Sequence, residues 1–574
     1  MSRHDVTAYP DTEGTQGAEG TQGTEGTRGA EGIRGTDGTG PTRAGGAAEA
    51  TEAGPARAGD ALRLSPRART AALTLLCFAV CLGIAAQQWT TLQLGGFDLG
   101  IFDQGVRGYA HFGLPVSSLK SFHHAFPPGF SLLGDHFSPV IALMAPLYWI
   151  WDDPRSLLIG QALCFAAGVP LIRRVADRCF ADADPRTARR AADLAGLAYG
   201  LGWPLLVASR GGFHEVAFAV PLTLLMLERG MARRYATAAL AGLLLCCTKE
   251  DMGLAVGAYG LVLLLRARRD EDRERRRQSA RWGTGFLVGG PLASAAAIAW
   301  LIPAMGGAPG YYWNYQSLGT DGGDALSHVL RDPTLLVSAL FDAPLKPLLL
   351  LWIFGTLFLL PLRSATVLCA LPLLAERVLS SNPNHWSIAR HYDAFLWPIL
   401  LVAALEVLGR HHGHALTRRL GVAAAAVTVV AALPLGAANL FVPAYWQPKP
   451  SEAALLRGAG QIPDGATVEA DNQAAPRLSA RTDVVLVDEK PRGREYVLIR
   501  SDKRAFPFKT DREQAARIEL LLAHGYRQIW SEGGVVLLHR EGSEPVPGEE
   551  VPGPDSTPYQ DEVPSDVGHN LFRG

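Results

Sequence analysis

The chain carries a long series of apolar stretches, each roughly 15–25 residues in length, between residues 71 and 442. A helix needs about 20 mainly apolar residues to cross the hydrocarbon core of a bilayer. The stretches lack the two-residue alternation of a barrel strand, and only helices or closed barrels satisfy backbone polar groups in lipid. The sequence therefore predicts an α-helical polytopic membrane protein.

These stretches predict about 11 transmembrane helices. They lie at residues 71–86, 157–172, 191–208, 216–227, 236–247, 252–265, 283–302, 347–360, 366–379, 394–408 and 420–441. One further stretch, at residues 136–151, is short, contains Pro139 and Pro146, and ends in aromatic residues. Those features favour a juxtamembrane or re-entrant helix, so we leave it out of the span count.

The arginines indicate which connections lie in the cytoplasm, since short basic loops stay there. With the stretch at 136–151 left out, the arginine-rich loops within 173–190, 266–281 and 410–419 all fall on the side of the N-terminus. The connections that carry aspartate and histidine fall on the other side. We therefore expect a cell membrane protein with a cytoplasmic N-terminus and an extracytoplasmic C-terminal region.

Composition divides the chain into four parts. Residues 1–65 are rich in Gly, Thr and Glu and are expected to be a disordered cytoplasmic region, residues 66–442 form the transmembrane domain, residues 443–540 form a small extracytoplasmic α/β domain, and residues 541–574 form a disordered tail. The α/β domain is expected to contain strands near 466–469, 484–487, 496–500, 528–531 and 535–539, with a helix at 512–524.

Charge and cysteine content exclude several classes of function. The formal net charge is -1, which gives no reason to expect a nucleic-acid partner, and the sequence contains no nucleotide-binding loop. The seven cysteines lie in or beside apolar stretches without metal-type spacing. They predict no disulfide framework.

The first candidate site follows the first predicted span, in the segment GGFDLGIFDQGVRGYAHFG. Asp98 and Asp103 are the candidate catalytic residues, since a carboxylate near a desolvating membrane surface can act as a general base. Five residues on a helix turn through about 140°, so the two carboxylates need not face one ligand. The alternative for Asp98 is a capping role at the N-terminus of a short helix.

Further polar residues stand at the outward ends of other spans. The segment FHHAFPPGFSLLGDHFSP offers His136 for substrate binding, with a helix-capping role open for Asp135 and metal binding by the histidines as an alternative. Side chains at span ends are often only anchors that extend toward the headgroups. The other candidate substrate-binding residues at span ends are His214, Glu215, Lys249, Glu250 and Asp251.

The segment SSNPNHWSIARHYDAFLWP supplies Arg390 and His391, which are suited to binding a phosphate. The alternative is an ion pair between Arg390 and Asp393 within an aromatic belt. Belt anchoring is also the preferred interpretation of the aromatic segment YYWNYQSLG at residues 311–319.

Taken together, FDLGIFDQ, GDHFSP, GGFHEVAF, TKEDMG and ARHYDAFLWP resemble a bacterial family of polytopic membrane proteins of unknown function, over most of residues 75–540. That family looks like a branch of the GT-C glycosyltransferases. The resemblance implies a polyprenyl-phosphate-sugar donor, an essential acidic residue in the first outward loop and a soluble outward C-terminal domain. Asp98 is the best match to the acidic residue and Asp103 the second, although the paired acidic motif of better-known branches is missing here.

The leading hypothesis is thus an inverting transferase that moves a sugar from a polyprenyl-phosphate donor to an envelope glycan, lipid or protein, with a divalent metal ion left open as cofactor. A transporter or lipid flippase is one alternative, which would show midplane charges, broken helices or an internal repeat. A membrane scaffold without catalytic activity is the other.

Overall fold

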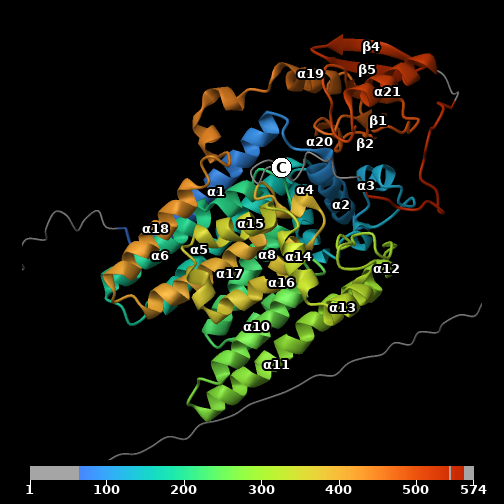
Figure 1. Cartoon of the computed structure of the whole chain (residues 1–574). Coiled ribbons are helices and arrows are strands. Elements are labelled where there is room, and N and C mark those ends of the chain that lie inside the picture. Colours follow the sequence, from blue (N-terminus) through green and yellow to red (C-terminus); the bar gives the residue numbers. More distant parts are fainter. Residues whose placement is uncertain (1–63, 542–544, 561–574) are drawn as a thin grey trace, which may run out of the picture. The chain divides into compact units, whose positions relative to one another are not determined.

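The computed structural model describes residues 64–541 and 545–560. The N-terminal region expected to be disordered lies outside the described residues, except for Leu64 and Ser65. Helices make up most of the chain as far as residue 459, and five strands follow them (Figure 1). The expected helical protein with a small C-terminal sheet is confirmed.

The first span is the helix α1 (Pro66–Thr90), which extends beyond the apolar stretch at 71–86 at both ends. Ser65 caps its N-terminus, because the Ser65 hydroxyl accepts a hydrogen bond of 3.2 Å from the backbone N–H of Ala68. Pro66 occupies the first helical position, where its missing N–H costs no hydrogen bond.

The remaining helical elements fall into three groups along the chain. Between α1 and the next long helix lie η1 (Gly96–Gly100), α2 (Ile101–Ala110), α3 (Ser118–His123), η2 (Leu132–Gly134), η3 (Pro139–Met144) and α4 (Ala145–Ile150). The middle group is α5 (Arg155–Cys179), α6 (Pro185–Leu201), α7 (Trp203–Ala208), α8 (Val216–Met231), α9 (Tyr235–Cys246), α10 (Met252–Ala267), α11 (Arg273–Ala296), η4 (Ala297–Leu301) and α12 (Ile302–Ala304). The last group is α13 (Gly322–Arg331), α14 (Thr334–Phe341), α15 (Leu345–Gly355), η5 (Leu360–Arg363), η6 (Ala365–Ala370), α16 (Leu371–Leu379), η7 (Pro383–Trp386), α17 (Tyr392–Arg410), α18 (Ala415–Val430), η8 (Ala437–Phe441) and η9 (Pro443–Trp446).

Every predicted span coincides with helical structure, but the spans differ in length. Within the described residues, five helices are long and apolar enough to cross a membrane, and α14 with α15 forms a sixth if this pair, bent by 85°, is one broken span. Helices such as α9 and α10 are apolar but shorter. The protein is thus a multi-pass membrane protein, and the count of about 11 spans stays a prediction. The stretch at 136–151 forms the short pair η3 and α4.

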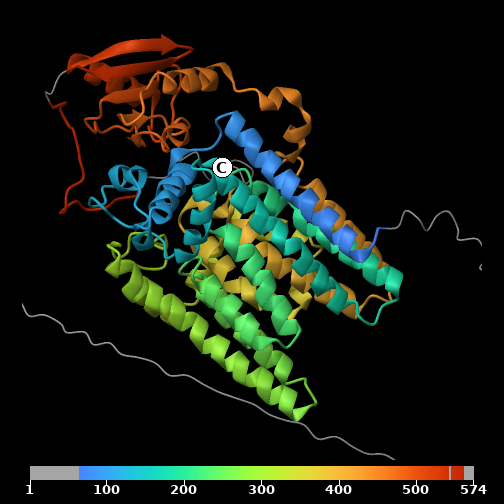
Figure 2. The same cartoon turned by 180° about the vertical axis from the view of Figure 1, so that it is seen from behind.

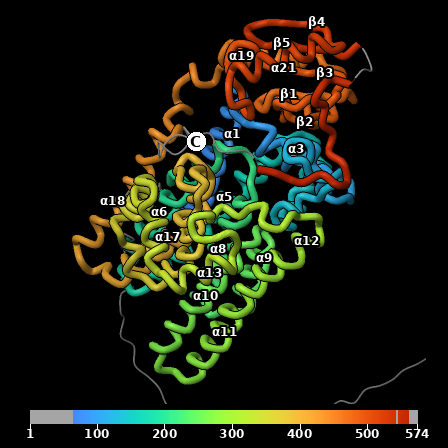
Figure 3. Tube along the Cα trace, turned by 45° about the vertical axis from the view of Figure 1, so that its right-hand side comes forward, coloured from blue at the N-terminus to red at the C-terminus, as the bar shows by residue number. Residues whose placement is uncertain are grey.

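Small residues bring α10 and α11 into close contact (Figures 2 and 3). A Cβ atom at Gly260 would lie 2.2 Å from the backbone nitrogen of Leu287, and one at Gly253 would lie 2.3 Å from the carbonyl oxygen of Gly290. Backbones approach this closely in membrane proteins where small residues face each other. The long α11 is thereby fixed against the helix bundle.

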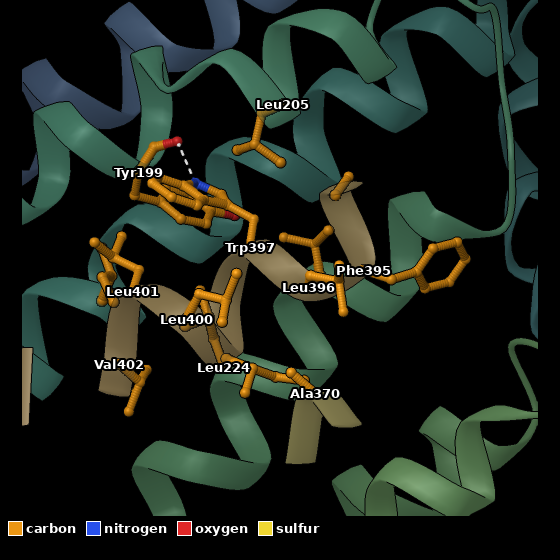
Figure 4. Packing of buried hydrophobic residues seen from close by; sticks show 14 of the residues in the cluster. Tyr199, Leu205, Leu224, Ala370, Phe395, Leu396, Trp397, Leu400, Leu401 and Val402 are labelled. Atoms are coloured by element: carbon orange, nitrogen blue, oxygen red, sulfur yellow. Dashed lines mark hydrogen bonds between the residues drawn. The ribbon is translucent and has the colours of Figure 1, made fainter. Parts of the chain in front are cut away.

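The helix α17 lies in the middle of the bundle and is almost entirely buried. Its Trp397 donates an indole hydrogen bond of 3.2 Å to the carbonyl oxygen of Tyr199 in α6, and Leu400 and Leu401 pack in the same core (Figure 4). Since Trp397 and Tyr199 are both large and buried, this contact fixes the direction of α17 relative to α6.

The C-terminal domain contains a mixed sheet of strand order β2-β1-β3-β5-β4. Its elements are α19 (Pro450–Ala459), β1 (Thr467–Ala470), α20 (Ala475–Leu478), β2 (Asp483–Leu486), β3 (Tyr496–Arg500), α21 (Asp511–Ala523), β4 (Tyr526–Glu532) and β5 (Val535–Arg540). The strand β1 is parallel to β2 and β3, with Val468 opposite Val484, whereas β5 is antiparallel to β3 and β4. All five strands lie within a few residues of their predicted positions.

The two faces of this sheet bury different partners, as the two-residue period of a strand requires. Val497 and Ile499 pack on the face that holds Leu521 of α21. Leu498 lies on the other face, in a cluster that also contains Leu119 of α3 and Ile101 of α2. The loops that follow α1 therefore share one apolar core with the sheet.

Part of the C-terminal segment is also in contact with the domain. Val546 is buried beside the sheet, and the carbonyl oxygen of Tyr559 lies 2.8 Å from His124 Nδ1. The composition predicts disorder from residue 541 onward, whereas residues 545–560 make defined contacts because Val546 and Tyr559 have partners. Residues 542–544 and 561–574 lie outside the described part of the chain.

We expect Gly96→Val to loosen the contact between η1 and the C-terminal domain. A Cβ atom at Gly96 would lie 2.6 Å from the Cβ of Ala475 and 3.2 Å from Leu486, so a larger side chain must push the two apart. Overpacking of this kind costs about 1–3 kcal/mol. The melting temperature of the detergent-solubilised protein should fall, whereas Gly285→Val, where a Cβ meets nothing within 4 Å, should leave it unchanged. Equal melting temperatures for both variants would contradict the shared core.

Candidate functional site

Asp98 lies inside the π-helical turn η1, between α1 and α2. The position before this turn is occupied by Gly95, so the capping role weighed for Asp98 is wrong. Two hydrogen bonds from the C-terminal domain hold the turn: the Asn472 carbonyl accepts from Gly96 N at 2.7 Å, and the Asn472 side chain accepts from Phe97 N at 2.9 Å. The Asp98 side chain is left 41% exposed.

Two other connections bring basic groups to this carboxylate. His214, just before α8, places its Nε2 atom 3.5 Å from Asp98 Oδ1. The ring of His391, at the start of α17, stacks on the ring of His214 with 3.8 Å between centroids. Arg390 is close enough for its charge to act on Asp98. Three of the predicted motifs thus converge.

The chain before α8 is shaped to hold His214 in place. Gln161 of α5 accepts a hydrogen bond of 3.2 Å from the His214 backbone N–H and donates one to the Gly212 carbonyl. Gly212 has a φ of +88°, which favours glycine, and the turn there passes beside Leu99 of η1. The position of His214 beside Asp98 is therefore set by the backbone.

The electrostatics of this group keep Asp98 ionised. Burial opposes its charge, but the hydrogen bond and charge of His214, together with Arg390, outweigh burial and lower the pKa of the carboxyl below its usual value. Burial lowers the pKa of His391 well below its usual value, and the charges of His214, Lys249 and Arg390 lower it further. His391 is accordingly a neutral imidazole stacked on the ring of His214, which in turn contacts Asp98.

Several buried polar atoms in this neighbourhood have no hydrogen-bond partner among the described residues. They are Arg390 Nε, His214 Nδ1, His385 Nδ1 and Asp251 Oδ1. Buried polar groups are nearly always hydrogen-bonded, so a group of unsatisfied ones calls for an explanation. A polar ligand that binds here would supply the missing partners.

A second set of charges lies in the connection between α9 and α10. Lys249 Nζ lies 2.9 Å from Asp251 and 3.8 Å from Glu376 of α16. Burial opposes the charge of Lys249, but Asp251, Glu376, Glu250 and Glu215 raise its pKa well above the usual value. Glu215 itself is buried at the start of α8. Lys249 therefore stays positively charged between carboxylates.

Glu250 joins the same connection to the segment before η3. His136 Nδ1 lies 2.8 Å from Glu250 Oε1, and the backbone N–H of Phe137 donates a hydrogen bond of 3.1 Å to Glu250 Oε2. Burial works against both charges, yet the attraction between the two groups raises the pKa of His136 to about 9 and lowers that of Glu250 to about 2. This is a partly buried, charged pair near neutral pH.

Asp103 lies in a different environment from Asp98. Its fully buried side chain accepts hydrogen bonds from Arg107, at 2.9 and 3.0 Å, and from the hydroxyl of Tyr148 in α4, at 2.6 Å. These contacts join α2 to α4. The two aspartates of the motif do not face one ligand, in agreement with their spacing.

The alternatives weighed for two other residues are also wrong. Asp393 pairs with Arg377 at 2.5 Å rather than with Arg390, whose amino group contacts Asn384 at 3.4 Å. The Asp135 side chain accepts no hydrogen bond from a described backbone N–H, so it does not cap a helix. It pairs instead with Lys120 at 2.9 Å.

Sequence reasoning missed Glu376 and the role of Tyr312. Glu376 lies in an apolar stretch, where a carboxylate is costly, and that position was the available signal. The ring of Tyr312 stacks on His136 with 4.4 Å between centroids, and its hydroxyl donates to Asp135. The belt role preferred for this aromatic segment therefore does not describe Tyr312.

The histidines His123 and His124 serve the contact with the C-terminal domain. His123 Nδ1 lies 3.1 Å from Asp488, which also accepts a hydrogen bond of 2.6 Å from Arg492. His124 Nδ1 lies 2.8 Å from the hydroxyl of Tyr311. In the described part of the chain, no group of three or more His, Cys, Asp or Glu side chains is arranged to hold a metal ion.

A helical membrane protein with a polar site between helix ends and a small C-terminal sheet is thus the class that the fold defines. The chain belongs to the family described as predicted membrane protein (DUF2079), whose model matches residues 88–537. This confirms the family expected from the motifs. A search among curated proteins gave no match.

Solved structures similar to this chain include two of ArnT from Cupriavidus metallidurans. The one bound to undecaprenyl phosphate is 14% identical with a TM-score of 0.43, over 83% of this chain and 98% of that one. The apo structure is 13% identical with a TM-score of 0.47, over 82% and 96%. The oligosaccharyltransferase of Archaeoglobus fulgidus tethered with an acceptor peptide is 12% identical with a TM-score of 0.38, over 88% of this chain and 77% of that one.

The paired charges of His136 and Glu250 predict a specific pH dependence of stability. Because the pKa of His136 is raised, its ion pair with Glu250 adds to the free energy of unfolding. This stabilisation is complete below the usual histidine pKa of 6.5 and is lost as the pH rises through about 9. The lowered pKa of Glu250 stabilises the fold in the same way: this stabilisation is complete above pH 4.5, the usual glutamate pKa, and is lost as the pH falls through about 2. The melting temperature of wild type should exceed that of Glu250→Gln most between pH 4.5 and 6.5, and the difference should narrow above pH 9.

The exposed Glu274→Gln variant is the control for this measurement, because no described residue forms an ion pair with Glu274. It should match wild type at every pH. If the difference in melting temperature between wild type and Glu250→Gln stayed the same above pH 9, the ion pair of His136 and Glu250 would not be the cause of that difference.

Proposed function

We propose that this protein is a membrane glycosyltransferase in which Asp98 receives the proton of an acceptor hydroxyl while a sugar leaves a polyprenyl-phosphate donor. The observation that carries the proposal is the geometry around Asp98. An ionised carboxylate, 41% exposed, lies 3.5 Å from His214 and within reach of the charge of Arg390, and the neutral His391 stacks on His214. A site that joins an anionic base to cationic groups suits a reaction with a nucleophile and an anionic leaving group.

The proton and the leaving group have separate places in this mechanism. The acceptor hydroxyl gives its proton to the Asp98 carboxylate as its oxygen forms a bond with the anomeric carbon. The bond between that carbon and the phosphate oxygen breaks, and the electron pair leaves with the polyprenyl phosphate. Attack opposite to the leaving group inverts the anomeric centre.

Arg390 is the residue best suited to bind the phosphate. Its guanidinium makes one long hydrogen bond, 3.4 Å to Asn384, and its Nε atom is buried without a partner among the described residues. A phosphate accepts several N–H donors of an arginine at once. Lys249 is less available to bind the phosphate, because Asp251 and Glu376 already surround its charge. It therefore attracts the phosphate only from a longer distance.

The position of these residues at helix ends supports a lipid-linked donor. Asp98 follows α1, His214 precedes α8 and His391 precedes α17, so the site lies where apolar helices stop. A polyprenyl chain would stay among the apolar helices while its phosphate reaches the polar groups. The motifs resemble a family that looks like a branch of the GT-C glycosyltransferases, and this resemblance implies the same class of donor and an envelope glycan, lipid or protein as acceptor.

Asp103 has a supporting role in this proposal. Its contacts with Arg107 and Tyr148 fix α2 against α4, and its buried side chain offers no surface to an acceptor. The pair of Glu250 and His136 and the residues Glu215 and Asp251 set the charge around the site without being the base. A divalent ion remains open as cofactor.

One observation favours the alternative of a transporter or flippase. The helices α14 and α15 form a pair bent by 85°, and broken helices are common where transporters bind substrates. The accessible charges lie at the ends of other helices, around Asp98, which favours chemistry over passage through the bilayer. A scaffold without activity has no observation in its favour.

Replacing Asp98 tests the proposed base. Asp98→Asn keeps the shape of the side chain but cannot accept the proton, so sugar transfer should fall by about 10²–10⁴-fold. The assay supplies radiolabelled polyprenyl-phosphate sugars, together with cell-envelope material that carries the acceptor hydroxyls, to the protein in nanodiscs, with and without a chelator, and follows label transferred from the lipid to that material. Asp152→Asn, which changes an exposed carboxylate that pairs with Arg107, should transfer at the wild-type rate.

Wild-type protein that transfers none of the lipid-linked sugars would overturn the proposed function. Transfer by Asp98→Asn at the wild-type rate would overturn only the role of the base. Release of lipid across the bilayer, without a change in its sugar, would instead favour the flippase.

The expected topology is testable by labelling. Arg512→Cys places a thiol on the exposed surface of α21, and Arg268→Cys places one after α10 in an arginine-rich connection. A membrane-impermeant maleimide should label residue 512 in intact cells and residue 268 only after permeabilisation. The wild-type chain, with its buried or half-buried cysteines, is the baseline. The reverse pattern would put Asp98 in the cytoplasm, where no extracytoplasmic acceptor is available.

A further inference from the structure

The helices α6, α17 and α18 are neighbours in the bundle (Figures 1 and 3). Their side chains line an apolar groove. Its cavity volume is about 190 Å³. The helix α17 begins beside the Asp98 site, at His391, and only its second half lines the groove, from Leu401 to Leu408. The groove therefore belongs to the opposite end of the bundle from that site.

Small side chains leave this space open. The wall formed by α18 contains Gly421, Ala424 and Ala425, and the wall formed by α6 contains Ala195 and Ala198. Alanine and glycine do not reach across to the leucines of α17. The rim is accessible, since Val422 of α18 is 52% exposed.

The mouth of the groove is basic. Arg190, near the start of α6, and Arg418, near the start of α18, both line it, together with His412 between α17 and α18. Both arginines are exposed, and no described residue forms an ion pair or hydrogen bond with either guanidinium. Other arginines at this end are partnered: Arg69 and Arg173 both pair with Asp193 at 2.6 Å.

We propose that this groove binds an anionic phospholipid, whose headgroup lies between Arg190 and Arg418 and whose acyl chain lies between α6, α17 and α18. Basic pockets between transmembrane helices bind anionic headgroups of the adjacent leaflet. A water-soluble anion would leave the apolar walls unused, and a neutral lipid would leave the arginines without a partner. The proposal is independent of the proposed sugar transfer.

Arginines at the ends of spans commonly extend toward the headgroups without any specific site. The chain offers a matched test of this alternative. Arg189 and Arg419 are the sequence neighbours of Arg190 and Arg418, are also exposed, and do not line the groove. Nonspecific attraction depends on the number of charges, whereas a built site depends on which arginines are present.

The experiment measures lipid that remains bound to the full-length protein. The protein is reconstituted in nanodiscs of phosphatidylglycerol and phosphatidylcholine in equal amounts, extracted into detergent and analysed by native mass spectrometry. Wild type should retain phosphatidylglycerol selectively. The double variant Arg190→Ala/Arg418→Ala should retain at least about tenfold less phosphatidylglycerol, whereas Arg189→Ala/Arg419→Ala should retain as much as wild type.

A third variant tests the apolar part of the site. Ala425→Leu fills the groove and keeps both arginines, so it should also release phosphatidylglycerol. The proposal would be overturned if the two double variants retained equal amounts of phosphatidylglycerol, or if Ala425→Leu retained as much as wild type. It would also be overturned if phosphatidylcholine bound equally well, or if added polyprenyl phosphate displaced all of the phosphatidylglycerol. Melting temperatures without phosphatidylglycerol confirm that every variant is folded.

Discussion

The attraction between the Asp98 carboxylate and the basic groups of two distant connections is the interaction on which the site depends. Charges are costly within apolar helices, so they gather where the helices end. Packing of α1, α8 and α17 on α5 then brings the ends together, which puts His214 beside Asp98 and Arg390 close enough to act on its charge. The lowered pKa of Asp98 is the direct consequence.

The C-terminal domain takes part in this arrangement, since Asn472 binds the backbone of η1 through both its carbonyl and its side chain. The turn that carries Asp98 is therefore fixed on one side by the sheet and on the other by the helix bundle. The apolar cluster of Leu119, Ile101 and Leu498 excludes water from the same contact. A mobile domain would leave the direction of the Asp98 side chain undefined.

Local patterns were enough to predict the elements, but not their partners. Apolar length marked the helices, and the two-residue period marked strands such as β3, because each pattern reflects burial within one element. The partner of Asp393 is Arg377 rather than Arg390, although Arg390 is nearer in the sequence, because the direction of a side chain depends on how α16 and α17 are placed. The capping role failed for a similar reason: the π-helical turn begins earlier than the pattern indicated and includes Asp98.

An ionised Asp98 has a further consequence for the proposed reaction. A carboxylate with a lowered pKa is a weak base, so it gains little by removing the acceptor proton early. Transfer from a glycosyl donor passes through a transition state in which the sugar carries positive charge. In the proposed reaction, a carboxylate held ionised by His214 and Arg390 would stabilise that charge throughout and take the proton late, when the acceptor oxygen has become acidic. The same basic groups that weaken Asp98 as a base would then be available to the departing phosphate, so one set of contacts would serve both halves of the proposed displacement.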